Sequence, residues 1–407
     1  MPRKVAAGPV NPVRASAVEL FFDLVFIFTL GRLSSTLAEE PSWVAAAHAV
    51  IFLLAFWWIW YNTNLATDSL DCERPTVQVL IICVMLGSLL MSINVPDAFG
   101  NQAFVFAGAY LGIHLGRTLV MALYLRGTPA WRRPVRGVIW YLLSGTLWFA
   151  GAASHGTARA LLWICALAID YAAPALRWWV PGLGRATAAE WRLSGEHLAE
   201  RYRQFIILAL GETILATGNF YRESSRDLED TAAFLITFWT VVFLWWTYFY
   251  RTTSSLAVKI NVAVDPYRVN LRAGYTHLLM VGGILLTGIG GELMLKAPGG
   301  TMSAGNVVAV LVGPLLFLVG RLIFEAWVFG QLTKYCLTSV VGCLLLSPVA
   351  ARLPPLAVGL LGAATITTVA AFDLTIRARL AGGVNPAAGG GAAGRSPVPP
   401  GPVTRSR

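Results

Sequence analysis

Apolar runs of about 18 or more residues recur along the whole chain, separated by short segments that contain charged residues, glycine or proline. Each run is long enough to cross a bilayer as a helix, and backbone polar groups in lipid must form their hydrogen bonds within the segment. The pattern predicts an all-α, polytopic transmembrane helical bundle with about 12 spans. The expected spans are 16–37, 43–64, 76–95, 102–125, 135–153, 157–176, 201–220, 231–250, 270–294, 303–326, 331–350 and 355–377.

Two boundaries between these spans are weak. Only residues 151–156 separate the fifth span from the sixth, and only Pro354 and Pro355 separate the last two. Span counts of ten or eleven therefore stay open.

Composition supports a membrane protein. Of 407 residues, 56% are hydrophobic and 13% are charged, and the mean hydropathy is +0.63, whereas a soluble domain carries about 25% charged residues. The formal net charge of +10 does not indicate nucleic-acid binding, because basic residues of a membrane protein usually mark cytoplasmic loops. The five cysteines form no C-x-x-C pair and the five histidines no H-E-x-x-H motif. We therefore expect no disulfide framework, no metal site and no cofactor.

Arginine and lysine are concentrated on one side of the predicted membrane. The opposite loops are short and often acidic, as at Glu39, Glu40 and Asp97. Basic residues favour the cytoplasm, so both termini are expected there, and an even number of spans agrees. The basic side includes Arg126, Arg132, Arg133, Arg136, Arg177, Arg185, Arg192, Arg201, Arg203, Arg268 and Arg272.

Five segments follow from this topology. Residues 1–14 are expected to form a cytoplasmic segment before an uncleaved first span, and residues 381–407, rich in Gly, Ala and Pro, a disordered cytoplasmic tail. Between them we expect a first transmembrane half (15–180), an interfacial amphipathic linker (181–200) and a second half (201–380). A plain solvated loop is the alternative for the linker. Trp pairs at 57–58 and 245–246 also fit two parallel six-helix halves.

Two carboxylates interrupt the first apolar run. Glu19 and Asp23 are four residues apart and share one face of a helix. A charge near the middle of a bilayer costs roughly 2.5–3.5 kcal/mol on insertion scales. Glu19 can lie at the headgroup level without a special role, but Asp23 is one turn deeper. We expect Asp23 to have a buried partner.

Further ionisable residues are expected at a similar depth, in the inner half of the membrane. Arg117, Asp170, Glu212 and His277 all fall within predicted spans. Intramembrane charges usually face the interior of a bundle or a cavity, so the set predicts a shared polar site. The alternative is a collection of structural ion pairs, for which i,i+4 pairs such as 321/325 and 373/377 are suited.

Two stretches resemble the signatures of a known family. Residues 19–26, ELFFDLVF, and residues 197–214, HLAERYRQFIILALGETI, are together similar to the bacterial low temperature requirement protein A family. The resemblance covers most of residues 14–375 and implies a multi-span protein of the bacterial plasma (inner) membrane, linked by name to growth in the cold. It carries over no activity, cofactor or catalytic residue. The residues that match its motifs are Glu19, Asp23, Glu200, Arg201 and Glu212.

The leading functional prediction is a transporter or permease rather than an enzyme. Asp23 and Glu212 would bind or relay a proton or cation, with Arg117 and His277 as counter-charges. The partners would be the lipid bilayer and an unidentified small molecule or ion. One alternative is an integral membrane enzyme acting on a lipid or isoprenoid, for which only Asp68-x-x-Asp71 resembles an acidic cluster. Another is a membrane scaffold or sensor.

Overall fold

The computed structural model describes residues 15–39, 42–250, 253–296, 304–350 and 352–382. The predicted segment 1–14 and residues 383–407 of the predicted tail lie outside the described residues. Within the described part the chain is helical, and its one β-type contact is an isolated bridge between Val180 and Gly184. The all-α prediction is confirmed for these residues.

Each predicted span corresponds to one helix, and one additional short helix lies between α8 and α10. Short turns of 3-10 or π helix occur at η1 (Pro129–Trp131), η2 (Ala188–Glu190) and η3 (Glu325–Phe329). The helices are α1 (Ala17–Glu39), α2 (Trp43–Thr67), α3 (Pro75–Ile93), α4 (Ala103–Tyr124), α5 (Arg132–Ala153), α6 (Gly156–Ala175), α7 (Gly195–Glu223), α8 (Leu228–Phe249), α9 (Thr253–Asn261), α10 (Pro266–Lys296), α11 (Ala304–Phe324), α12 (Lys334–Ala350) and α13 (Pro355–Gly382).

Eight stretches in the described residues are long and apolar enough to cross a membrane, judged by length and composition. They are α2, α3, α4, α6, α8, α10, α13 and the stretch Ala309–Phe329. The chain is therefore a multi-pass helical membrane protein, and the count of about 12 spans stays a prediction.

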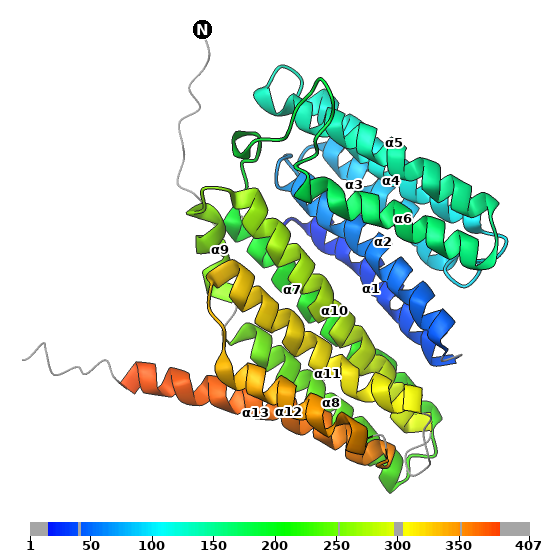
Figure 1. Cartoon of the computed structure of the whole chain (residues 1–407), viewed down its shortest axis with the longest axis vertical. Coiled ribbons are helices and arrows are strands. Elements are labelled where there is room, and N and C mark those ends of the chain that lie inside the picture. The colour runs from blue at the N-terminus through cyan, green and yellow to red at the C-terminus, as the bar shows by residue number, and fades with distance from the viewer. Residues whose placement is uncertain (1–14, 40–41, 251–252, 297–303, 351, 383–407) are drawn as a thin grey trace, which may run out of the picture.

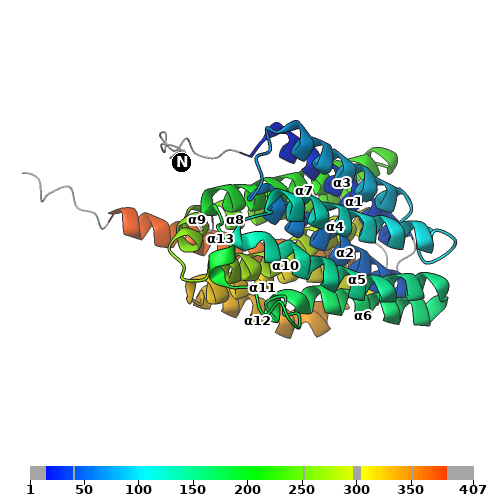
Figure 2. The ribbon, with the colours of Figure 1, turned by 90° about the horizontal axis from the view of Figure 1, so that it is seen from above.

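The helices run side by side in two groups. Figure 1 shows α1–α6 on one side of the molecule and α7–α13 on the other. The groups meet where α1 packs against α7 and α10, and where α2 packs against α10. In the view from above, α10 lies within the bundle (Figure 2), and most of its residues are buried. A symmetry between the two groups stays a prediction.

Small residues bring α10 and α11 into close contact. A Cβ at Gly283 would lie 2.5 Å from the backbone nitrogen of Phe317, and a Cβ at Gly290 would lie 2.9 Å from the Cα of Val310. Such close approach of two backbones is typical of helix pairs in membranes. It fixes α10, which carries several of the polar residues described below.

The expected amphipathic helix over 181–200 is formed only at its end, where residues 195–200 belong to α7. Gly182 and Gly184 have left-handed φ angles of 78° and 68°, which favour glycine and end a right-handed helix. The segment then makes the single turn η2 and continues without helix until α7 begins at Gly195. It is nevertheless packed, because Arg136 donates to the carbonyl of Leu183 at 2.7 Å and to Glu190 at 2.7 Å. Residues 181–194 are therefore a packed loop, which differs both from the expected helix and from the alternative of a plain solvated loop.

Candidate functional site

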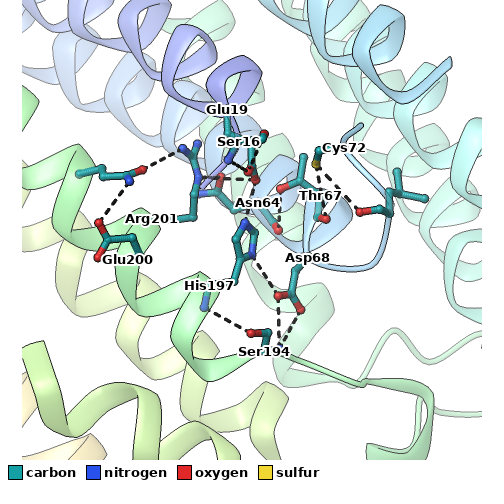
Figure 3. A network of polar contacts seen from close by, with 12 residues as sticks. Ser16, Glu19, Asn64, Thr67, Asp68, Cys72, Ser194, His197, Glu200 and Arg201 are labelled. Atoms are coloured by element: carbon teal, nitrogen blue, oxygen red, sulfur yellow. Dashed lines mark hydrogen bonds and ion pairs between the residues drawn. The ribbon is translucent and has the colours of Figure 1, made fainter. Parts of the chain in front are cut away.

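A group of buried charges lies where the first turns of α1 and α7 meet the last turn of α2 (Figure 3). Glu19 and Asp23 share one face of α1, as their spacing predicts, and both are buried. His197 and Arg201 lie one turn apart on α7 and contact them. Asp68, the C-cap residue of α2, completes the set. We call these five residues the Glu19–Arg201 network.

Arg201 is the counter-charge of Asp23. Its Nη2 donates to Asp23 Oδ1 at 2.6 Å, and the side chains of Arg201 and Asp23 are 1% and 0% exposed. The indole N–H of Trp60 donates to the same oxygen at 2.8 Å. Arg201 also donates from Nε to Asn64 Oδ1 at 3.0 Å. Further hydrogen bonds to Asp23 Oδ1 and from Arg201 thus support the ion pair, whereas Asp23 Oδ2 is buried and has no hydrogen-bond partner among the described residues.

His197 joins two carboxylates from different helices. Its Nε2 lies 2.9 Å from Glu19 Oε1 and its Nδ1 lies 3.1 Å from Asp68 Oδ1. Ionised carboxylates only accept hydrogen bonds, so both ring nitrogens have to donate, which is the imidazolium form. His197 precedes the expected span 201–220. Burial there lowers the pKa of His197, but the hydrogen bonds to Asp68 and Glu19 outweigh burial and raise this pKa to about 9.

Glu200 lies at the edge of this network. Its Oε2 is 3.3 Å from Arg203 Nη1, and its Oε1 accepts from Gln204 Nε2 at 3.2 Å. Gln204 in turn accepts from Arg201 Nη1 at 3.4 Å. Glu200 is 37% exposed, so its ion pair contributes little. It supports Arg201 through Gln204 rather than facing the buried carboxylates.

Glu212 lies further along α7, away from Asp23. It faces α1 at Gly31, where a Cβ would collide with Glu212 Oε1. It also lines a small cavity of about 10 Å³ together with Ser34 of α1 and Gly288 of α10. No hydrogen bond or ion pair of Glu212 to another described residue is found. Asp23 and Glu212 therefore lie along the same helix interface, but they do not form one shared site.

Glu292 is a buried carboxylate that the sequence analysis did not select. It lies on α10, is 1% exposed, and accepts from Ser34 Oγ at 3.1 Å through its Oε1. Its Oε2 is buried and has no hydrogen-bond partner among the described residues. The α1–α7–α10 interface thus carries carboxylates at three levels, with Asp23, Glu212 and Glu292.

Two comparisons with known proteins show the family of this chain. The model of the bacterial low temperature requirement A protein (LtrA) family matches residues 14–371. The chain belongs to this family. It is also 38% identical over 317 residues to a protein of Rhizobium meliloti (strain 1021) that is named only as uncharacterized, covering 77% of each chain. In this LtrA family member, the two motif stretches are far apart in sequence. They meet directly, because Glu19 contacts His197 and Asp23 contacts Arg201 across 178 residues.

Arg117 on α4 and Asp170 on α6 lie in the α1–α6 group of this LtrA family member and have partners of their own. Arg117 Nη2 is 2.8 Å from His114 Nδ1, and Arg117 Nη1 donates to Thr63 Oγ1 at 3.2 Å. Asp170 accepts from Tyr110 OH at 2.8 Å. All of these side chains are buried. The prediction that Arg117 acts as a counter-charge for Asp23 and Glu212 is not supported by these contacts.

His277 is also separate from the carboxylates. Its Nε2 is 2.9 Å from Tyr248 OH and its Nδ1 is 2.7 Å from the carbonyl oxygen of Ala273. The prediction that His277 acts as a counter-charge for Asp23 and Glu212 is not supported by these contacts. The expected shared site at one depth is resolved into distinct groups: the Glu19–Arg201 network, the carboxylates further along α1–α7–α10, the Arg117 group and His277.

The structure of this LtrA family member also shows the contacts of the acidic pair Asp68/Asp71 and of the expected i,i+4 ion pairs. The acidic pair Asp68 and Asp71 is divided: Asp68 faces His197, while Asp71 pairs with the exposed Arg74 at 3.2 Å. The expected i,i+4 pair Arg321 and Glu325 is confirmed at 3.1 Å. Asp373 is a further partner of Arg321, at 2.8 Å. Structural ion pairs and the Glu19–Arg201 network therefore coexist.

Proposed function

We propose that the protein is a permease that moves protons or a monovalent cation along the α1–α7–α10 interface, coupled to a small solute. The observation that carries the proposal is the placement of Asp23, Glu212 and Glu292 at successive levels of one interface. On α1 the contacted positions run from 23 to 34, which is about 16 Å at 1.5 Å per residue. Intramembrane carboxylates that face a bundle interior commonly mark ion or proton pathways.

The incomplete pairing of the deeper carboxylates supports this role. Glu212 has no ion pair among the described residues, and one oxygen of Glu292 has no hydrogen bond there. Glu292 is 1% exposed and Glu212 is half-buried, and a carboxylate that is withdrawn from water and has no ion pair binds a proton or cation readily. Asp23 differs in having an ion-pair partner, Arg201 at 2.6 Å, although its Oδ2 also has no hydrogen-bond partner among the described residues. Glu212 and Glu292 would thus take up the ion, and the Asp23–Arg201 pair would close the pathway at one end.

The Glu19–Arg201 network would act as the gate at that end. We assign this arrangement to a closed form of the permease, because the cavity beside Glu212 measures about 10 Å³, which is close to the minimum for one water molecule. Separation of Asp23 from Arg201 would leave two buried charges unpaired. A proton or cation reaching Asp23 would weaken the pair and favour opening.

The test is ion flux in proteoliposomes. Full-length protein is reconstituted, a potassium diffusion potential is imposed with valinomycin, and internal pH is followed with a trapped dye. We expect flux above protein-free liposomes, with Glu212→Gln and Glu292→Gln each reducing it at least about tenfold, because each removes a group that takes up the ion. The matched control is Glu223→Gln on the same helix, where the carboxylate is 71% exposed, and its flux should equal that of the unmodified protein.

Two results would overturn the proposal. The first is wild-type flux no higher than in protein-free liposomes, under both proton and sodium gradients. The second is equal flux in the Glu212→Gln, Glu292→Gln and Glu223→Gln proteins.

A further inference from the structure

A second feature, separate from the carboxylates, is a cavity between the two helix groups. It has a volume of about 350 Å³, within the range of small-molecule sites. Its walls come from the end of α6, the loop around η2, the first turns of α10 and η3. The basic residues of these segments lie on the side that the sequence predicts to be cytoplasmic.

The cavity has an excess of positive charge. Three arginines line it, Arg177, Arg268 and Arg272, against one carboxylate, Asp265. Asp265 pairs with Arg177 at 2.9 Å. Arg272 donates one N–H to the carbonyl oxygen of Trp327 at 3.0 Å. Among the described residues, neither Arg268 nor Arg272 has an ion-pair partner, so two guanidinium groups can bind an anion.

The remaining walls are apolar and rigid. Leu271, Tyr275 and Trp327 lie on them. The ring of Trp191 stacks on Tyr267 with centroids 3.8 Å apart, so part of the wall is fixed by ring packing. Such a surface accepts an apolar or aromatic body beside the anionic group.

The orientation of α10 strengthens the preference for an anion. The helix begins at Pro266 and is 31 residues long, so the positive end of its dipole lies at the cavity. The planar fork of arginine matches the oxygens of a phosphate group. Asp265 occupies only part of this positive surface, since it accepts from the backbone N–H of Arg268 and pairs with Arg177.

We propose that this cavity binds a phosphate ester carried on an apolar or aromatic body, held by Arg268 and Arg272. Two sources share this chemistry: the headgroup of an anionic phospholipid and a phosphorylated metabolite in solution. Basic pockets between membrane helices on this side are suited to lipid headgroups. The site would be independent of the ion pathway, because its arginines are not part of the Glu19–Arg201 network.

The experiment measures dissociation constants of full-length protein in neutral detergent at fixed ionic strength. The lipid arm compares dioctanoyl phosphatidylglycerol with dioctanoylglycerol, which lacks the phosphate. The soluble arm compares adenosine monophosphate with adenosine. We expect the phosphate-bearing probe of one arm to bind at least about tenfold more tightly than its match, and Arg268→Gln/Arg272→Gln to remove that advantage. The control is Arg126→Gln/Arg132→Gln, which removes two exposed arginines of the same predicted face.

A cavity-filling variant makes the test independent of charge loss. Ala175 lines the cavity and is exposed, so Ala175→Trp reduces the available volume and should weaken binding of the favoured probe about tenfold. Binding in the lipid arm identifies a headgroup site, and binding in the soluble arm identifies a metabolite site. The proposal is overturned if no phosphate probe exceeds its match, or if both arginine double variants weaken binding equally. It is also overturned if Ala175→Trp, folded as judged by its melting temperature, binds as the unmodified protein does.

Discussion

The contact between Asp23 and Arg201 gives the sharpest quantitative expectation. The two groups are 2.6 Å apart and 0% and 1% exposed, so removal of one partner leaves the other charged and buried. We expect Asp23→Asn and Arg201→Gln each to lower the free energy of unfolding by about 3–5 kcal/mol. The double variant removes both charges, and Glu19, which lies 3.9 Å from Arg201, keeps its contact with His197, so the loss should be smaller than the sum by about 2–3 kcal/mol.

The measurement is unfolding of the purified protein in mixed micelles, followed by tryptophan fluorescence, for the four proteins of this double-mutant cycle. The matched control cycle uses Arg222 and Glu223, a pair on the same helix with side chains 69% and 71% exposed, for which no measurable coupling is expected. Additive losses in the Asp23–Arg201 cycle would refute the reasoning, because the two charges would then not stabilise one another.

Three further predictions concern His197 and two glycines. In the folded protein the pKa of His197 is raised from 6.5 to about 9, so the stabilising effect of the imidazolium is complete below pH 6.5 and is lost as the pH rises through 9. His197→Gln should therefore flatten the plot of melting temperature against pH between these values. An unchanged slope in this variant would contradict the prediction. Gly31→Ala should reduce ion flux with little change in melting temperature, because the added Cβ displaces the end of the flexible Glu212 side chain. The control is Gly112→Ala, where a Cβ meets nothing within 4 Å, and this variant should change neither quantity. Equal flux in the two variants would contradict the prediction. Gly283→Ala should lower the free energy of unfolding by about 1–3 kcal/mol, because the added Cβ meets the backbone of α11. The neighbouring Gly282→Ala, whose Cβ would have its nearest contacts at 3.5 Å, should lower this free energy less. Similar melting temperatures for the two variants would contradict the packing of α10 against α11.

The helices could be predicted from the sequence because hydropathy is a local property. Each apolar run became one helix within a few residues. The loop over 181–194 was not predicted, because its charged residues suggest an amphipathic helix, whereas Gly182 and Gly184 have a left-handed backbone that stops a helix. The isolated turn η2 alone retains helical character there.

The candidate site was predicted only in part. The four-residue spacing placed Glu19 and Asp23 on one buried face, but the partner of Asp23 depends on a contact across 178 residues, which local pattern cannot supply. One signal was present: His197 and Arg201 have the same spacing with the opposite charge, so an acidic pair on one helix matches a basic pair on another. Glu292 was missed because its position near the end of an apolar run suggested the membrane surface, whereas α10 continues to Lys296 and buries it.

The distance along the chain between Asp23 and Arg201 has a consequence for biosynthesis. The first helix leaves the ribosome with its carboxylates long before the arginine that neutralises them is translated. Each unpaired acid within the lipid would cost roughly 2.5–3.5 kcal/mol, so α1 gains its final depth only after α7 has been inserted beside it. Nascent chains that stop short of Arg201 would be substrates for membrane quality control.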